Sequence, residues 1–293
     1  MIQARHARRM ARTYSTGSFA SIVHAGGNPG FMNLGYTPNP LRRATSPQRQ
    51  RDLVRLLMGS IAAEPGQFLL DAGCGNGGMS NLIGRSVPGA TVVGIDVDAH
   101  QLARASATAA TGVYFVNAAA EDLPFPPGVF DTVYSVELLS HVRDKEQLAA
   151  ELTRVLRPGG RAVLAYIALT KPFAESSVAD QAHLERVAAL FCEHPADIPT
   201  QDSAERTFVR AGLRLLRSTD LSDGVFAPRY AEFVSMLRTL AHPNPLIRAV
   251  AAAVAKYRWG VQPAEFTRVL RINTQAHPCR FYEYHVMELT KEA

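Results

Sequence analysis

The stretch "LLDAGCGNGGMS", residues 69–80, places four glycines directly after a short apolar run. A glycine-rich turn between a strand and a helix lets the backbone approach a ligand closely and directs helix N–H groups toward it. The stretch therefore predicts a strand at 68–71, a ligand-binding turn and a helix at 77–86. The residues around the turn decide which ligand it binds.

The rest of the chain continues this alternation of strand and helix patterns. Further strands are expected at 91–96, 113–117, 132–136, 162–166, 213–218 and 280–289, and further helices at 99–109, 145–156, 178–192 and 203–211. Short β-rich runs that alternate with helices indicate βαβ units, in which helices cover both faces of a parallel sheet. The sequence therefore predicts an α/β protein with a doubly wound, mostly parallel sheet.

The chain is expected to divide into four parts. These are an N-terminal arm at 1–45, an α/β core at 46–220, a helical lid insertion at 221–278 and a last core strand within 279–293. The arm is rich in glycine, proline, asparagine and aromatic residues, which predicts a loop. The core opens with a helix that has Ser46 as its expected N-cap and Pro47 at its first position.

The composition is that of a globular protein with a sizeable core, since 47% of its 293 residues are hydrophobic. The net charge of +5 comes from the first 51 residues, which carry eight arginines and no acidic residue. The remaining 23 basic and 26 acidic side chains leave a net charge of −3, which argues against a nucleic-acid partner. No apolar run is long enough to span a bilayer. Three widely spaced cysteines predict reduced thiols and a cytoplasmic protein.

The glycine turn itself fits two cofactor-binding templates. Read to Gly78, it satisfies G-x-G-x-x-G, the dinucleotide fingerprint; read from Asp71 to Gly77, it satisfies D-x-G-x-G-x-G, a loop of S-adenosylmethionine (SAM) enzymes. A dinucleotide would place its pyrophosphate over the turn, where the Asp71 carboxylate is unfavourable. The cationic sulfonium and ammonium groups of SAM gain from that carboxylate. Asp71 therefore favours SAM, whereas Asp96, at the end of the next strand, can bind the ribose of either cofactor.

Five motifs in order and at the usual spacing extend this pattern over residues 67–166: LLDAGCGNGG, VVGIDVD, EDLPF, FDTVYSVELLSHV and LRPGG. With these motifs the chain resembles the class I SAM-dependent methyltransferases. The resemblance implies a seven-stranded, Rossmann-like sheet whose last strand, at 280–289, runs antiparallel to its neighbours. In the arm, "FMNLGY" resembles a short N/H-x-G-Y element of small-molecule methyltransferases of secondary, lipid and isoprenoid metabolism. The implied partner is therefore a small molecule.

The resemblance also implies a set of residues around SAM. In the core, the implied cofactor-binding residues are Asp71, Gly73, Cys74, Gly75, Asp96, Val97, Ala120, Glu121, Asp122, Ser135 and Val136. Ala118 and Ala119 stand where the family often has a Gly-Asp pair that contacts the adenine. This contact must then come from the backbone or from one of the two acidic residues that follow. Tyr14 and Tyr36 in the arm are expected to close over the cofactor, or else to pack on the edge of the sheet.

Methyl transfer from SAM is an in-line displacement at an activated carbon. The protein therefore mainly supplies alignment and, for a hydroxyl acceptor, a base. His141, just after the fourth expected strand, is the predicted general base because the ordinary pKa of histidine lies near neutrality. The alternative is that His141 only caps or packs the helix that follows. Glu137 is the second predicted catalytic residue and is expected to orient the cofactor.

The lid is expected to provide a largely hydrophobic acceptor pocket. Its predicted substrate-contacting residues are Tyr230, Phe233 and Trp259, and a helix-packing core would give the same pattern. The favoured acceptor is a hydroxylated natural product that is O-methylated with His141 as base. The alternative is an isoprenoid, for instance a prenyl diphosphate held by lid arginines, that is C-methylated through a carbocation. A SAM-binding scaffold without transferase activity is an alternative of another class, and a homo-oligomer stays open.

Two further observations exclude other chemistries. Methyltransferases that act on the amino groups of nucleobases or glutamine usually have an N-P-P-Y/F element after the fourth strand, where this chain reads "YSVELLSHV". The sequence also has no cluster of residues with metal-ligand spacing, so no metal is expected. The sequence thus argues against a DNA or RNA N-methyltransferase and against a metal-assisted site.

Overall fold

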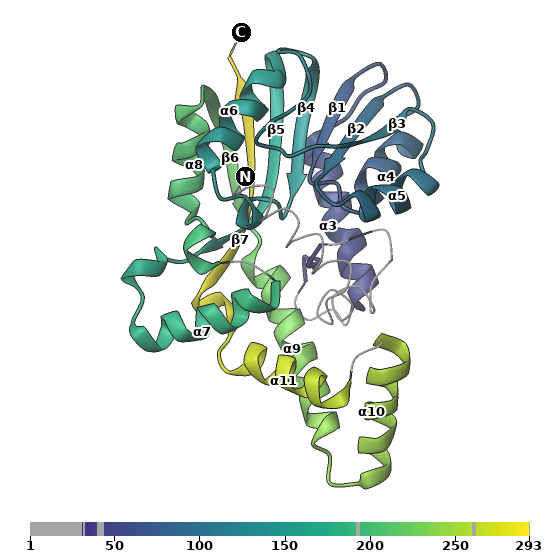
Figure 1. Cartoon of the computed structure of the whole chain (residues 1–293), viewed down its shortest axis with the longest axis vertical. Helices are drawn as coiled ribbons and strands as arrows, with labels where there is room; N and C mark the ends of the chain where they lie inside the picture. Colours follow the sequence, from purple (N-terminus) through teal and green to yellow (C-terminus); the bar gives the residue numbers. More distant parts are fainter. Residues whose placement is uncertain (1–30, 32, 40–43, 192–193, 260–261, 293) are drawn as a thin grey trace.

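The computed structural model describes residues 31, 33–39, 44–191, 194–259 and 262–292. Its centre is a seven-stranded sheet in the order β3-β2-β1-β4-β5-β7-β6 (Figure 1). The strands are β1 (Phe68–Ala72), β2 (Thr91–Asp96), β3 (Val113–Asn117), β4 (Phe130–Val136), β5 (Leu156–Leu169), β6 (Leu213–Asp220) and β7 (Tyr282–Lys291). Strands β1 to β5 pair in parallel, and β7 is antiparallel to both β5 and β6. The predicted fold class is therefore confirmed.

Helices cover both faces of this sheet. The core helices are α3 (Ser46–Ile61), α4 (Gly78–Ser86), α5 (Ala99–Ala107), α6 (Lys145–Val155) and α8 (Gln201–Arg210). Successive strand residues point to opposite faces. Leu69 of β1 accordingly packs in one hydrophobic cluster with Leu57 of α3, whereas Leu70 packs in a second cluster with Leu152 of α6. The sheet is thus buried on both sides, as a parallel sheet requires.

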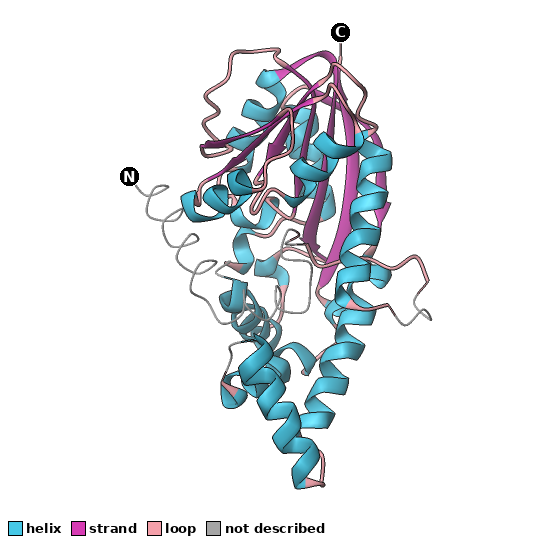
Figure 2. Ribbon diagram, turned by 90° about the vertical axis from the view of Figure 1, so that its right-hand side faces the viewer, coloured by secondary structure: helices cyan, strands magenta, loops and turns pink. Residues whose placement is uncertain are grey.

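Three helices lie between β6 and β7 in the chain: α9 (Ser222–Leu240), α10 (Pro245–Trp259) and α11 (Pro263–Thr274). Figures 1 and 2 show that they project beyond the carboxyl ends of the parallel strands, with α10 farthest from the sheet. Phe233 of α9 packs with Phe266 and Leu270 of α11. A fourth helix, α7 (Val178–Ala188), contacts α11. The division of the chain into an arm, a core and a lid stays a prediction.

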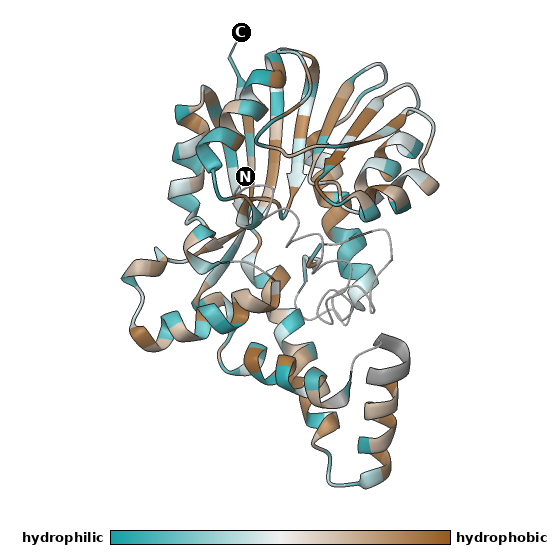
Figure 3. Ribbon diagram, in the orientation of Figure 1, coloured by the Kyte–Doolittle hydropathy of each residue, from teal (hydrophilic) through white to brown (hydrophobic). Residues whose placement is uncertain are grey.

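Apolar segments run along the strands and also along α10 (Figure 3). Those in the strands are mostly buried, whereas α10 exposes 74% of Leu246 and 64% of Val250. In the part of the chain that the structure describes, no helix is long and apolar enough to cross a membrane. The apolar residues of α10 therefore contribute little to the core.

The start of α3 differs from the sequence prediction by one residue. Ser46 is the first helical residue and Pro47 the second, so the N-cap is Thr45 and not Ser46. Thr45 has extended backbone angles, and its N–H donates a hydrogen bond to Gln48 Oε1 at 2.8 Å. Thr45 and Gln48 thus form a capping box, which fixes the start of the helix.

Several further boundaries differ from the prediction, mostly by one or two residues. Strand β5 begins at Leu156 and not at residue 162, because Leu156 already pairs with Phe130 before a bulge that contains the LRPGG turn. Helix α7 ends at Ala188 and continues as a 3-10 turn to Phe191, and the end of the expected helix at Cys192 lies outside the described residues. Strand β7 begins at residue 282 because residues 278–280 form a 3-10 turn.

Two helical glycines offer a matched test of packing. Gly59 in α3 has open space where a Cβ would stand, whereas a Cβ on Gly84 in α4 would lie 2.4 Å from Val113 Cγ2. We expect Gly59→Ala to raise the free energy of unfolding by up to about 1 kcal/mol, because alanine is the better helix former. Gly84→Ala should lower it by about 1–3 kcal/mol, because overpacking against β3 outweighs that gain. Urea titration followed by circular dichroism measures both, and shifts of the same sign would contradict this account.

Candidate functional site

The glycine turn between β1 and α4 is held against the end of β2. The N–H groups of Gly73 and Cys74 both donate to the carbonyl oxygen of Ile95, at 2.9 and 2.8 Å. The N–H of Gly75 donates to Asp96 Oδ2 at 2.9 Å. Gly73 and Gly75 have φ angles of +77° and +53°, which residues with a Cβ rarely adopt. The turn therefore presents bare backbone at the carboxyl edge of the sheet.

Two carboxyl groups lie beside this turn. Asp71, near the end of β1, is buried and accepts a hydrogen bond from the Ser80 hydroxyl, and burial raises its pKa to about 7. Burial also raises the pKa of Asp96 at the end of β2, although its Oδ1 accepts a hydrogen bond from the Asp98 N–H at 2.9 Å. A cationic ligand placed beside such a carboxyl group favours its ionised form. The carboxyl pair and the open backbone thus fit the charge and the hydroxyl groups of SAM.

The other residues expected to bind the cofactor follow the ends of neighbouring strands. Ser135 and Val136 end β4, where Ser135 pairs in register with Ala72 of β1. Val97 directly follows β2, and residues 120–122 belong to the turn after β3. Because adjacent parallel strands end at one edge of a sheet, all these residues reach the same edge. Their contact with the cofactor stays a prediction.

Glu137 joins the core to the arm and to the last strand. It follows β4 with a φ of +60°, an uncommon angle for a residue with a Cβ, and its N–H donates to the Ala165 carbonyl of β5 at 2.7 Å. Its Oε1 accepts hydrogen bonds from the Leu34 N–H in the arm, at 2.8 Å, and from the Tyr284 hydroxyl in β7, at 3.1 Å. Burial raises the pKa of Glu137 to about 7. These contacts make Glu137 an anchor of the arm, and its contact with the cofactor stays a prediction.

The arm is held from the lid side as well. The carbonyl oxygen of Leu34 accepts a hydrogen bond from Arg229 Nη2 in α9 at 2.9 Å. Further along the arm, the Thr37 N–H donates to the Gly224 carbonyl of α9 at 3.0 Å. The backbone of Leu34 therefore lies between a carboxylate of the core and a guanidinium of the lid. Sequence reasoning missed this role of Arg229, and only the "FMNLGY" element pointed to this part of the arm.

Of the two arm tyrosines, Tyr36 lies within the residues that the structure describes. A Cβ on Gly224 would lie 2.4 Å from Tyr36 Cε2, so the Tyr36 ring packs directly on α9. The Tyr36 N–H donates to the Arg49 carbonyl of α3 at 2.9 Å. Tyr14 lies outside the described residues. Closure of these tyrosines over the cofactor stays a prediction, and the ring of Tyr36 has a packing role on the lid.

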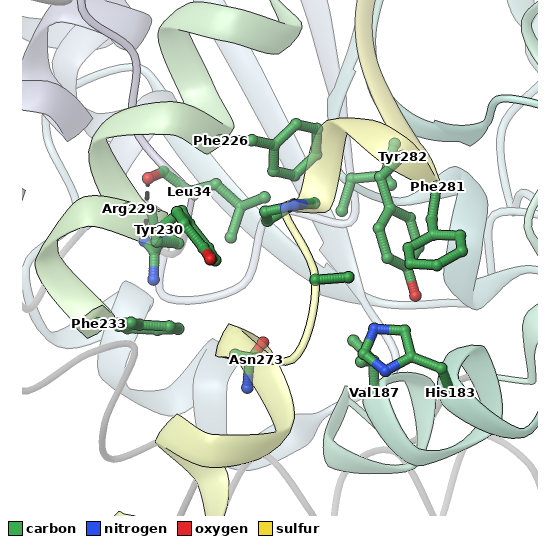
Figure 4. Close-up of a pocket in the computed structure, with 13 residues that line it drawn as sticks. Leu34, His183, Val187, Phe226, Arg229, Tyr230, Phe233, Asn273, Phe281 and Tyr282 are labelled. Atoms are coloured by element: carbon green, nitrogen blue, oxygen red, sulfur yellow. Dashed lines mark hydrogen bonds between the residues drawn. The ribbon is translucent and has the colours of Figure 1, made fainter. Parts of the chain in front are cut away.

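A pocket of about 750 Å³, part of it open to solvent, lies between the arm, α7, α9, α11 and the start of β7 (Figure 4). Most of its wall is apolar and includes Leu34, Phe226 and Phe281. Tyr230 and Phe233, which the sequence predicted to contact the substrate, both line it. The third predicted residue, Trp259, has its side chain outside the described part of the structure. The arm and the lid thus enclose an apolar cavity.

His141 is placed differently from these pocket residues. It ends a 3-10 turn, Leu139–His141, that directly follows β4, and its N–H donates to the Leu138 carbonyl at 2.9 Å. Its side chain is half-buried and is not among the described residues that line the pocket. It lies at the same carboxyl edge as the glycine turn. Its role as general base stays a prediction.

The pocket contains a histidine that sequence reasoning missed. His183 of α7 lines the cavity, and its Nδ1 lies 3.3 Å from Gln275 Oε1. An amide oxygen only accepts hydrogen bonds, so Nδ1 carries the proton and Nε2 is left as an acceptor. Burial lowers the pKa of His183, which favours this neutral form at pH 7. No motif marked His183, because α7 lies outside the resemblance to known motifs.

Comparison with known proteins agrees with this geometry. A family model described as a methyltransferase domain matches residues 70–164. The "O-methyltransferase rstn1" of Aspergillus nomiae is 31% identical over 199 residues, which cover 66% of this chain and 85% of that protein. The match thus extends over most of the relative and beyond the glycine turn.

Solved structures extend the similarity to the whole chain. The crystal structure of the [4+2]-cyclase SpnF superposes with a TM-score of 0.73 at 20% identity, covering 98% of this chain and 97% of that one. The geranyl diphosphate C-methyltransferase from Streptomyces coelicolor A3(2) superposes with a TM-score of 0.69 at 17% identity, covering 98% of each chain. At these identities the similarity shows a common fold that includes the helices between β6 and β7.

The raised pKa of Glu137 predicts how the free energy of unfolding depends on pH. The pKa of Glu137 rises from an ordinary 4.5 to about 7 on folding, so the folded protein binds the extra proton between these values. Its contribution to stability is full below pH 4.5 and is lost as the pH rises to about 7. Relative to the Glu137→Gln variant, the free energy of unfolding of the wild type should fall by about 3 kcal/mol at most as the pH rises from 4.5 to about 7. Urea titrations at stepped pH measure the difference, and two curves that stay parallel would contradict the prediction.

Proposed function

The chain belongs to the class I SAM-dependent methyltransferases, and we propose that it methylates a hydroxyl group of a small, largely hydrophobic natural product. The observation that carries the proposal is the apolar pocket enclosed by the arm and the lid. The Aspergillus relative is named as an O-methyltransferase, which supports the reaction type. Because the chain is an enzyme of this family, the alternative of a non-catalytic SAM-binding scaffold is removed.

SAM is the cofactor of this family and supplies a methyl group that its sulfonium makes electrophilic. In our proposal, Asp71 and residues 73–75 hold the methionine end, and Asp96 accepts the ribose hydroxyls. Residues 120–122 cover the adenine, and Ser135 and Val136 form the floor beside the methionine end. The support for this assignment is that all these residues lie along one edge of the sheet. The raised pKa of Asp71 adds further support, because a cation bound beside this carboxyl group would favour its ionised form and be stabilised by it.

For the acceptor, we assign the general base to His141. Its turn directly follows β4, next to the residues assigned to the methionine end. His141 would accept the hydroxyl proton as the methyl group passes to the acceptor oxygen, with the bond between the methyl carbon and the sulfonium sulfur breaking and the neutral thioether leaving. Glu137 positions the arm through Leu34, so that the pocket is closed on that side. The apolar wall excludes water and aligns the acceptor.

C-methylation of an isoprenoid is the second candidate reaction. The observation that favours it is the aromatic lining by Phe226, Tyr230 and Phe233, since aromatic faces stabilise a carbocation. A C-methyltransferase with geranyl diphosphate as its named substrate shares the fold. The O-methylation proposal remains the first, because a relative that is 31% identical, with 85% of its length covered, is named for that reaction.

The proposed function predicts where the transferred methyl group ends up. Incubating the full-length chain with ¹³C-methyl SAM and a fractionated small-molecule extract should transfer label to an apolar small molecule. The ¹³C chemical shift of the new methyl group distinguishes O-methyl from C-methyl products. Label found only in protein or nucleic acid would refute the small-molecule proposal. An inactivated sample with the same extract serves as the control.

The proposed base predicts a specific kinetic loss. His141→Ala should lower kcat by about 10²–10⁴-fold, because general-base catalysis typically contributes that much. The affinity for SAM, measured by calorimetry, should stay within about twofold, because a base acts on the acceptor and not on the cofactor. His194→Ala is the matched control, since His194 lies in the turn that precedes residues 195–197, with its ring against Phe173. A near-normal kcat for His141→Ala would leave that histidine with a packing role only.

A further inference from the structure

Arg229 lines the apolar pocket but has no carboxylate partner of its own. Among the described residues, its Nη2 donates one hydrogen bond to the Leu34 carbonyl at 2.9 Å, and no carboxylate oxygen pairs with it. Its Nε–H is buried and has no acceptor in that part of the chain. The ring of Phe233 lies 5.9 Å from the guanidinium carbon, a weak cation–π contact. The guanidinium is therefore incompletely satisfied.

The nearest acidic groups, Glu232 and Glu137, attract the Arg229 guanidinium through space but make their hydrogen bonds with other residues. Glu232, three residues further along α9, forms an ion pair with Arg49 of α3. Glu137 accepts two hydrogen bonds through Oε1, and its pKa of about 7 leaves it only partly ionised at neutral pH. The chain up to residue 51 has no acidic residue, so the rest of the arm brings no negative charge. Arg229 thus keeps an excess positive charge.

The charges around Arg229 determine how much negative charge an anion bound at this end of the pocket would carry. Arg49 and Arg229 together carry two positive charges, Glu232 carries one negative charge, and Glu137 carries about half of one near pH 7. The local excess is therefore about half a positive charge near pH 7, and it approaches one charge as Glu137 is protonated at lower pH. A single carboxylate neutralises that excess, whereas a phosphate dianion or a diphosphate would leave net negative charge beside Glu137 and Glu232. Buried charge without a partner is unfavourable in either sign.

We propose that the corner of the pocket at Arg229 is a carboxylate subsite, and that the acceptor is a hydrophobic carboxylic acid whose apolar body crosses the cavity. This inference rests on the proposed function, because it names the class of acceptor for the same pocket. Figure 4 shows Arg229 and Tyr230 on one side of the cavity and His183 on the other. The carboxylate anchors one end at Arg229 while the apolar wall, including Phe226 and Phe281, holds the rest.

Calorimetry on the full-length chain tests the subsite without any methyl transfer. The probes are decanoate, 1-decanol and decyl phosphate at pH 7, which share an apolar chain and differ in head-group charge. Decanoate should bind at least about tenfold more tightly than 1-decanol, because a charge-assisted hydrogen bond to a buried guanidinium contributes that much. It should also bind more tightly than decyl phosphate. Equal affinities for decanoate and 1-decanol overturn the subsite, and tighter binding of decyl phosphate overturns its assignment to a carboxylate.

Matched variants on one helix locate the effect. Arg229→Gln should reduce the preference for decanoate over 1-decanol to within about twofold, while Arg238→Gln, an exposed arginine of the same helix, should keep it. Because Arg229 also holds Leu34, Arg229→Lys is the second variant, which retains the charge and should retain most of the preference. An equal loss in Arg229→Gln and Arg238→Gln, or no loss in Arg229→Gln, contradicts the proposal. These binding results are independent of the labelling experiment, so a failure of either proposal is recognised separately.

Discussion

The Glu137 carboxylate is the contact on which the relation of sheet, arm and lid depends. It accepts hydrogen bonds from Leu34 in the arm and from Tyr284 in β7, while its own N–H bonds to β5. These bonds tie together segments 103 and 147 residues apart from Glu137. The backbone supports them with a φ of +60°, an angle that costs energy and persists only where the surroundings enforce it. The strained residue stands at the end of β4, where the sheet edge meets the pocket.

The same contact explains why this edge combines carboxyl groups of raised pKa with an apolar cavity. Covering Glu137 by the arm removes it from water, and that burial raises its pKa. Asp71, on the neighbouring strand, is buried in the same way beneath the glycine turn. Two carboxyl groups that titrate near neutrality thus border the site.

The fold of the core, and the glycine turn at the edge of its sheet, could be predicted from sequence because their signals are local. The turn from Asp71 to Gly77, and Asp96 at the end of the next strand, are each short patterns whose position in a parallel sheet follows from strand order. His183, and the contact of Arg229 with the arm, could not be found in this way. Arg229 acquires its role from Leu34, 195 residues away, and His183 from Gln275, 92 residues away. In a helix pattern both read as ordinary surface residues, since only tertiary packing turns them toward the pocket.

Helix α9 contacts the arm and also lines the pocket, and Arg229 does both. Gly224 and Arg229 bind the arm, through Tyr36, Thr37 and Leu34, while Phe226 and Phe233 face the cavity. Leu34 itself lines that cavity, so the pocket wall is complete only when the arm lies in place. Leu34 and helix α9 therefore form a joined part of the pocket wall, which is anchored to the sheet through Glu137. Because Leu34 is part of the wall, a substitution that loosens the arm changes the shape of the pocket.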